Sequence, residues 1–363
     1  MSKNKSSLTK ATKKDAASSL VAVELLADLR LLIERSRERV AQTVNSELVL
    51  LYWRVGKRIN DDVLQNQRAG YGEQILPTLS AKLETEFGKG FSARNLARMV
   101  QFAESFPDEN VVAALSERLS WSHFVEIIPL KDDLKRDFYA EMCRVERWSV
   151  RALRDRINGM LFERTAIAKK PDELIRKELD ALRETDRLTP DLIFRDPYIL
   201  DFLKLPAEYS ERELESAIIR EIEKFLLELG TDFSFVARQK RMTIGADDFY
   251  LDLLFYHRGL RRLVAIELML GKFSPEYFGK ITLYLRWLDK YERRESEETP
   301  IGIVLCSTKD EEQIELLEID KEGIRVGEYL TELPPREVLE VKLGEAVRFA
   351  RARLLEKQSE AAD

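Results

Sequence analysis

The chain of 363 residues is 44% hydrophobic and 34% charged, so it has enough apolar side chains for folded cores, and a wholly disordered chain is excluded. Its net charge of −6 excludes a general polycation, so contacts with nucleic acid would need local basic patches. The two cysteines, Cys143 and Cys306, and the two histidines, His123 and His257, exclude a disulfide framework and zinc fingers.

The N-terminal segment is rich in lysine and lacks the apolar stretch of a secretory signal. We therefore expect residues 1–20 to form a disordered basic tail. No stretch of the chain reaches the roughly 18 apolar residues that a membrane-spanning helix needs. Together with the sparse cysteines, this predicts a cytoplasmic protein that does not enter a membrane.

Residues 21–170 carry apolar residues at helical spacing, which predicts an all-helical domain with short turns. One helix is expected over residues 93–106, because Ser92 is a suitable N-cap and Pro107 ends the helix. We expect this domain to be winged-helix-like and to bind DNA or a protein partner.

The polar face of that predicted helix carries Arg94, Arg98 and Gln101, opposite its apolar residues. This arrangement resembles the second helix of a helix-turn-helix unit, whose side chains reach phosphates or base edges. The alternative is an ordinary solvated helix face. The first interpretation makes these three residues candidates for nucleic-acid binding.

Residues 171–192 are highly charged and contain two prolines, so we expect a linker there with a connecting helix inside it. The next domain, residues 193–345, shows alternating helix and strand signals, and residues 346–363 finish a last helix and form a tail. The predicted elements are helix 211–229, strands 233–244, 248–257 and 263–270, helix 276–292, strand 301–306, helix 310–318 and strand 324–330. The whole chain is thus predicted to be α+β, with an all-helical domain before a mixed α/β domain.

Two predicted strands each carry one charge in an apolar interior, Asp252 in the second strand and Glu267 in the third. A buried, unpaired carboxylate is costly, so each needs a partner. Two carboxylates on neighbouring strands can share a divalent cation, which satisfies both. The alternative is that each pairs with an arginine or caps a turn. We favour the metal site because both acids occur together.

The predicted helix 211–229 offers a third acid. At 100° per residue Glu221 falls in the middle of its apolar stripe, between Ile218 and Phe225, while Glu215 lies at the edge. An acid inside an apolar stripe indicates that it faces a site. The alternative is that Glu221 reaches a neighbouring arginine.

An acidic helix, an Asp on one strand, an acid on the next and a following helix together resemble the PD-(D/E)XK nuclease fold. The segments FLLELGTDFSFVARQKRMTIGADDFYLDLLFYH, LVAIELMLGKFSPEYFGKITLYLRWLDKYERR and PIGIVLC resemble the bacterial YhcG-type family of these nucleases. GFSARNLARMVQFAESFP and LSWSHFVEIIPL resemble the helical N-terminal domain of the same family. The resemblance implies a restriction-endonuclease-like domain that hydrolyses phosphodiester bonds with Mg²⁺ or Mn²⁺.

The family pattern also implies roles for individual residues. Asp252 matches the metal-binding Asp, and Glu267 matches the acid of the Glu-X-Lys motif. Glu215 sits where the family carries a further acid; since the helix periodicity favours Glu221, both remain candidate metal ligands. Gln239 and Lys280 are expected to line the cleft, so the resemblance places them with Asp252 and Glu267 among the catalytic candidates.

The motif departs from the family at one position, because this chain has Met269 where the family has lysine. A thioether carries neither a charge nor a proton, whereas the lysine would hold a water and offset charge on the phosphate. Either the site is weakened, or a neighbouring lysine, Lys280 or Lys272, takes over. Metal binding through Asp252 and Glu267 should survive.

The resemblance and the residues together predict a bacterial, metal-dependent DNA endonuclease. The alternative is a DNA-binding or assembly factor that keeps the fold but has lost turnover with Met269. The sequence does not separate DNA from RNA as the substrate, and it leaves a homo-oligomer open.

Overall fold

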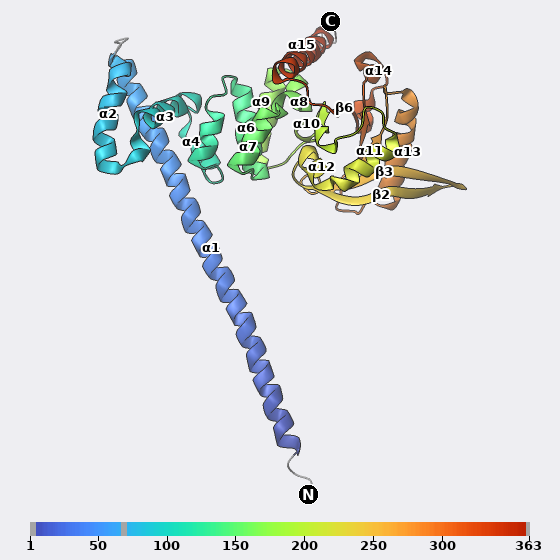
Figure 1. The fold of residues 1–363 in the computed structure, drawn as a ribbon, viewed down its shortest axis with the longest axis horizontal. Helices are drawn as coiled ribbons and strands as arrows, with labels where there is room; N and C mark the ends of the chain where they lie inside the picture. Colours follow the sequence, from blue (N-terminus) through green and yellow to red (C-terminus); the bar gives the residue numbers. More distant parts are fainter. Residues whose placement is uncertain (1–4, 67–70, 361–363) are drawn as a thin grey trace. The chain divides into compact units, whose positions relative to one another are not determined.

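The computed structural model describes residues 5–66 and 71–360 (Figure 1). The chain divides into two compact units, residues 1–131 and residues 132–363. The dividing point lies before the predicted linker 171–192, which belongs to the second unit together with the sheet. In the described part of the chain, no helix combines the length and apolar character needed to cross a membrane.

The first unit consists of helices. They are α1 (Lys5–Asn66), α2 (Tyr71–Phe87), η1 (Lys89–Phe91), α3 (Ala93–Ser105), α4 (Glu109–Ser116) and α5 (Trp121–Ile127). Residues 5–20 form the first part of α1, so the expectation of a disordered tail is wrong for them. No glycine or proline interrupts the helix there. Residues 1–4 of the predicted tail lie outside the described residues. No strand occurs in residues 5–66 or 71–131, so a winged-helix-like domain is not what this part of the chain forms.

The core of the first unit lies where α1 crosses α3. Tyr52 and Ile59 of α1 pack against Leu96 and Met99 of α3. Gly56 permits this close approach, because a Cβ built on it would lie 1.8 Å from the carbonyl oxygen of Met99. The crossing fixes α3 with its apolar face inward, as its sequence periodicity predicts.

Replacing Gly56 by alanine is expected to lower the stability of the first unit by about 1–3 kcal/mol, because the two helix backbones must separate to admit the methyl group. Urea unfolding followed by circular dichroism measures the change. Gly344→Ala in the helix over residues 336–360 is the matched control. An added Cβ meets nothing within 4 Å there, so a gain of up to about 1 kcal/mol is expected. An unchanged midpoint for Gly56→Ala would contradict the tight crossing.

The second unit begins with helices. They are α6 (Asp133–Glu146), α7 (Val150–Asn158), α8 (Leu161–Arg164), η2 (Ala166–Lys169), α9 (Asp172–Thr185) and α10 (Pro190–Ile193). The predicted linker therefore contains α9 and α10, and α9 is packed rather than free. It buries Ile175, Leu179 and Leu182, and its Arg183 forms an ion pair at 2.6 Å with the buried carboxylate of Glu141 in α6.

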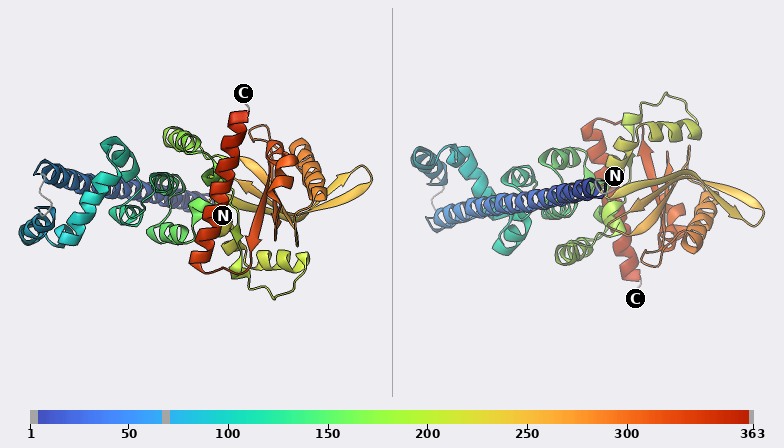
Figure 2. Two further views of the ribbon diagram at one scale, coloured as in Figure 1. Left: turned by 90° about the horizontal axis from the view of Figure 1, so that it is seen from above. Right: turned by 90° about the horizontal axis from the view of Figure 1, so that it is seen from below.

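A six-stranded mixed sheet follows these helices (Figure 2). Its strand order is β1-β6-β5-β4-β3-β2, with β2, β3 and β4 antiparallel and with β4, β5, β6 and β1 parallel. The hairpin of β2 and β3 extends beyond the rest of the sheet. The elements are β1 (Tyr198–Ile199), η3 (Asp201–Leu203), α11 (Glu211–Arg220), α12 (Ile222–Leu229), β2 (Phe233–Ile244), β3 (Asp247–His257), β4 (Arg262–Leu268), α13 (Pro275–Tyr291), β5 (Ile301–Cys306), α14 (Glu311–Leu316), η4 (Ile319–Glu322), β6 (Ile324–Leu330) and α15 (Arg336–Glu360).

The predicted order of strands and helices is confirmed, so the helical region followed by a mixed α/β region is the fold class that the sequence predicted. The two-residue strand β1 was not predicted. The helix predicted over 211–229 is in fact two helices, because Glu221 leaves the helical conformation with φ −107° and ψ 32°. This break changes the direction in which every later side chain of the segment points.

Candidate active site

Asp252 and Glu267 lie side by side on β3 and β4. The two strands pair in register with Leu253 opposite Ile266, and extending that register by one residue puts Asp252 opposite Glu267. The backbone N–H of Asp252 donates to Oε1 of Glu267 at 3.4 Å, and the backbone N–H of Leu268 donates to Oδ2 of Asp252 at 2.9 Å. Each carboxylate therefore contacts the strand that carries the other.

Lys280 reaches this pair from α13, which packs on β4 and β5 through Ile281 and Tyr284. Its Nζ donates to Oε2 of Glu267 at 2.6 Å. The Glu267 side chain is 1% exposed, whereas the Lys280 side chain is 40% exposed. The ammonium also lies 5.7 Å and 5.6 Å from the ring centroids of Tyr277 and Tyr284. Lys280 thus connects a buried carboxylate to the solvent.

The environment shifts the pKa values of all three groups. Burial, reinforced by the charge of Asp252, raises the pKa of Glu267 to about 7, although Lys280 opposes the shift. Burial also raises the pKa of Asp252, against the hydrogen bond from Leu268. Burial alone would lower the pKa of Lys280, but the Glu267 carboxylate outweighs it and raises that pKa. A paired, charge-sharing cluster in a cleft is typical of functional sites.

Gln239 on β2 contacts the same cluster, since its Nε2 donates to Oδ1 of Asp252 at 2.9 Å. Its backbone has φ 47°, the left-handed region, which costs a non-glycine residue about 1–2 kcal/mol. Strain of this kind persists where the surrounding structure over-determines it. No sequence pattern predicts this conformation.

Glu215 lines a cavity of about 450 Å³ together with Asp252. Its buried carboxylate forms an ion pair with Arg238 at 2.6 Å. Glu221 is not part of this cavity: its carboxylate binds Lys224 at 2.7 Å, which lowers the pKa of Glu221. The helix-wheel argument for Glu221 assumed a continuous helix, and the break at that residue invalidates it. The cavity is lined by Glu211, Arg212, Glu215, Arg238, Gln239 and Asp252.

The donor set suits a divalent cation through two carboxylates rather than three. Within the described ranges, no group of three or more His, Cys, Asp or Glu side chains is close enough to hold a metal ion. Asp252 and Glu267 are nevertheless adjacent and repel one another, as the raised pKa of Glu267 reflects. A cation between them would remove that repulsion, so the two residues fit such an ion.

Comparison with known proteins identifies the family of this chain. Residues 28–164 match the family described as the DUF1016 N-terminal domain, and residues 191–344 match the YhcG PDDEXK nuclease domain. A protein of Escherichia coli (strain K12), "Putative nuclease YhcG", is 33% identical over an alignment of 308 residues that covers 77% of this chain and 81% of that protein. The chain belongs to the YhcG family of PD-(D/E)XK nucleases. Such nucleases typically use divalent metal ions.

Two solved structures were also found to be similar. A repair endonuclease from Pyrococcus abyssi is 22% identical, with a TM-score of 0.25 over 34% of this chain and 48% of that one. An EndoMS–dsDNA complex is 20% identical, with a TM-score of 0.26 over 36% of this chain and 49% of that one. This chain thus spans about half the length of both structures.

Against the YhcG-family motif, Met269 stands where lysine is expected, one residue beyond β4. Its side chain is buried in an apolar cluster that includes Phe273 and Tyr284. Of the two lysines proposed to replace it, Lys272 forms an ion pair with Asp310 at 3.1 Å, whereas Lys280 contacts Glu267. The structure therefore brings Lys280, and not Lys272, to the carboxylate pair.

The candidate nucleic-acid residues lie on α3 of the first unit. Arg94 and Gln101 are exposed and Arg98 is half-buried, while the opposite face packs into the core. This arrangement matches the predicted face; DNA contact by these residues stays a prediction.

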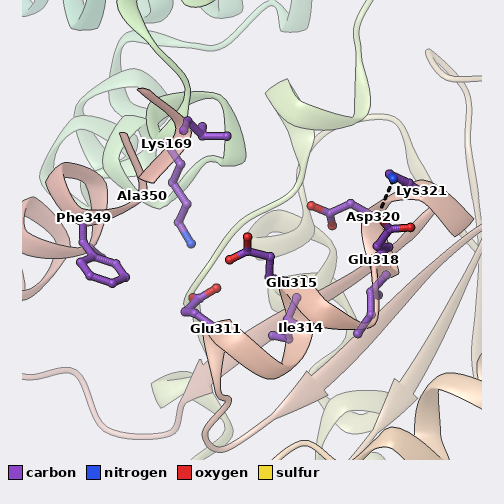
Figure 3. A pocket seen from close by; sticks show the side chains of 12 residues that line it. Lys169, Glu311, Ile314, Glu315, Glu318, Asp320, Lys321, Phe349 and Ala350 are labelled. Atoms are coloured by element: carbon purple, nitrogen blue, oxygen red, sulfur yellow. Dashed lines mark hydrogen bonds and ion pairs between the residues drawn. The ribbon is translucent and has the colours of Figure 1, made fainter. Parts of the chain in front are cut away.

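A second cavity, of about 390 Å³, lies between α15 and the segment formed by α14 and η4 (Figure 3). Lys169 and Phe349 are on one side of it, and Glu311 and Glu315 are on the other. Lys169 is already paired with Asp196 at 2.6 Å. None of the predicted site residues lines this cavity, so we assign no catalysis to it.

The remaining candidates from the composition are structural. Cys143 and Cys306 are buried, free thiols whose pKa values burial raises to about 12, which keeps them unreactive. His123 completes a capping box with Ser120 at the start of α5. His257 is fully buried, and burial lowers its pKa to about 4.

Proposed function

We propose that this chain is an endonuclease that hydrolyses phosphodiester bonds in DNA, with Asp252 and Glu267 as the ligands of Mg²⁺ or Mn²⁺. The observation that carries the proposal is the contact of Lys280 with Glu267 beside Asp252, in a domain of the PD-(D/E)XK family. Carboxylate oxygens are preferred ligands of these ions. A lysine beside them can offset the charge that develops on a phosphate during cleavage.

Each residue of the cleft then has a distinct role. A bound divalent ion would lower the pKa of a water and neutralise phosphate charge. Gln239 orients Asp252 through its amide. Lys280 performs the role of the motif lysine, whose position is occupied by Met269 in this chain. Glu215 lines the same cavity as Asp252 and can act as a further metal ligand. Its ion pair with Arg238 must break before it can do so.

Cleavage of supercoiled, linear and branched DNA, with RNA as a further substrate, tests the proposal. The whole chain should nick or cut DNA with Mg²⁺ or Mn²⁺ and not with EDTA, and Asp252→Asn should abolish the activity. DNA binding without cleavage of any substrate would contradict it and would favour the alternative, a DNA-binding or assembly factor disabled by Met269.

We also propose that α3 contributes DNA contacts through Arg94, Arg98 and Gln101. Reversing both arginines to glutamate is expected to weaken DNA binding and to reduce the slope of log K against log salt by about 2, because two phosphate contacts are lost. Fluorescence anisotropy at several salt concentrations measures both. Arg30→Glu, at an exposed arginine of α1, is the control. Equal affinity and slope in the double variant would exclude this helix as the DNA contact.

The expected setting is the bacterial cytoplasm. The family match to a protein of Escherichia coli and the two free, buried cysteines support it, since free thiols are typical of reducing compartments. Fractionation of cells that express the whole chain tests the compartment.

A further inference from the structure

Helix α1 exposes a line of apolar side chains. Ile33, Val40, Val44 and Leu51 are between 44% and 63% exposed. At 100° per residue their directions agree within about 40°, so they form one narrow stripe, which we call the α1 stripe. Large apolar side chains that lie exposed along one face of a helix mark an interaction site.

The core of the first unit does not use this stripe. Val49 and Trp53, which α1 buries toward α3 and α4, point about 160° away from it. The other buried apolar residues of α1, Tyr52 and Ile59, point about 80–100° away from it. Side-chain hydrogen bonds from Gln42, Asn45, Ser46 and Arg54 join α1 to α4 and the turn after it. In Figure 1 the N-terminal part of α1 runs on beyond α2, α3 and α4. A helix extended in this way gains most of its stability from burying an apolar face.

We propose that the α1 stripe is a self-association surface, on which two copies of this chain pair through α1 in antiparallel orientation. The spacings between its members are 7, 4 and 7 residues, so the stripe repeats every 11 residues and is symmetric about Gln42. An 11-residue apolar repeat is a pattern of paired helices. In an antiparallel pair centred at Gln42, Ile33 of one copy meets Leu51 of the other, and Val40 meets Val44.

The charges beside the stripe favour the same register. Arg37 and Glu47 are both exposed, border the stripe and lie five residues on either side of Gln42. The antiparallel pair brings Arg37 of one copy level with Glu47 of the other, twice per dimer. A parallel pair would align arginine with arginine and glutamate with glutamate, which is unfavourable. Arg54, level with Arg30 in this register, is already neutralised by Glu109 at 2.7 Å.

Sedimentation equilibrium of the whole chain tests the surface. The native chain should show a concentration-dependent dimer, and Val40→Glu/Val44→Glu should be monomeric because four acidic groups would face one another. Leu31→Glu is the matched control: this leucine is 45% exposed on the opposite side of α1, so the dimer should persist. Equal helix content by circular dichroism shows that the variants fold. A native monomer at every concentration, or a dimer in the double variant, would overturn the proposal.

A charge exchange tests the orientation. Arg37→Glu alone should weaken the dimer about tenfold, because each dimer gains two like-charge contacts. Adding Glu47→Arg should restore the native dissociation constant, since the exchanged charges meet across the pair. Failure of the second change to restore dimerisation would overturn the antiparallel register. These readouts do not depend on nuclease activity.

Discussion

Replacing Lys280 by alanine should lower the rate of DNA cleavage by two to three orders of magnitude. The reason is that Lys280 is the cation that contacts Glu267, at 2.6 Å, and removal of a single group that stabilises transition-state charge typically has this effect. The measurement is a single-turnover cleavage assay with Mg²⁺, with thermal unfolding of the same variant as a check on the fold.

The matched control is Lys290→Ala, which removes an exposed lysine from the same helix and should leave cleavage unchanged. Lys280→Arg keeps the charge but changes its shape, and it should recover part of the rate. Full activity in Lys280→Ala would show that this lysine has not replaced the one missing from the motif.

The second large effect is expected from Met269→Lys in two backgrounds. In the native chain, a second lysine should change cleavage by less than threefold and should lower stability, because its ammonium enters an apolar cluster. In the Lys280→Ala background, it should restore cleavage at least tenfold, because Met269 shares the strand face of Glu267 and a lysine there can reach the same carboxylate.

Met269→Leu, which keeps the cluster apolar, is the control and should leave cleavage unchanged in both backgrounds. A rise of one order of magnitude or more in the native background would mean that the native site is disabled and that Lys280 does not compensate.

Most of the sheet could be predicted because its strands show local sequence patterns, either apolar runs or alternation of apolar and polar residues. The strand predicted over 233–244 is β2, and IGIVLC is β5, residue for residue. Alternation also placed Asp252 and Glu267 as lone charges in apolar strands, and the structure puts them opposite one another. The strand β1 escaped prediction because two residues contain no periodicity.

The errors concern features that tertiary packing decides. No local sequence signal marks the break at Glu221. A helical wheel for an unbroken helix therefore gave the wrong direction for its side chain. The charged segment 171–192 resembles a linker in composition, yet its few apolar residues suffice to dock α9 on α6. The left-handed backbone of Gln239 has no sequence signature, although the family resemblance places this residue in the cleft.

The central claim is that Asp252 and Glu267 bind one divalent cation, and calorimetric titration of the whole chain with Mn²⁺ tests it most directly. Asp252→Asn and Glu267→Gln should each weaken binding at least tenfold, because each removes one of two charged ligands. Glu221→Gln is the matched control, since that carboxylate binds Lys224 outside the cavity, and its affinity should equal that of the native chain. Unchanged Mn²⁺ affinity in Asp252→Asn, or a loss of affinity in Glu221→Gln, would contradict the proposed metal site.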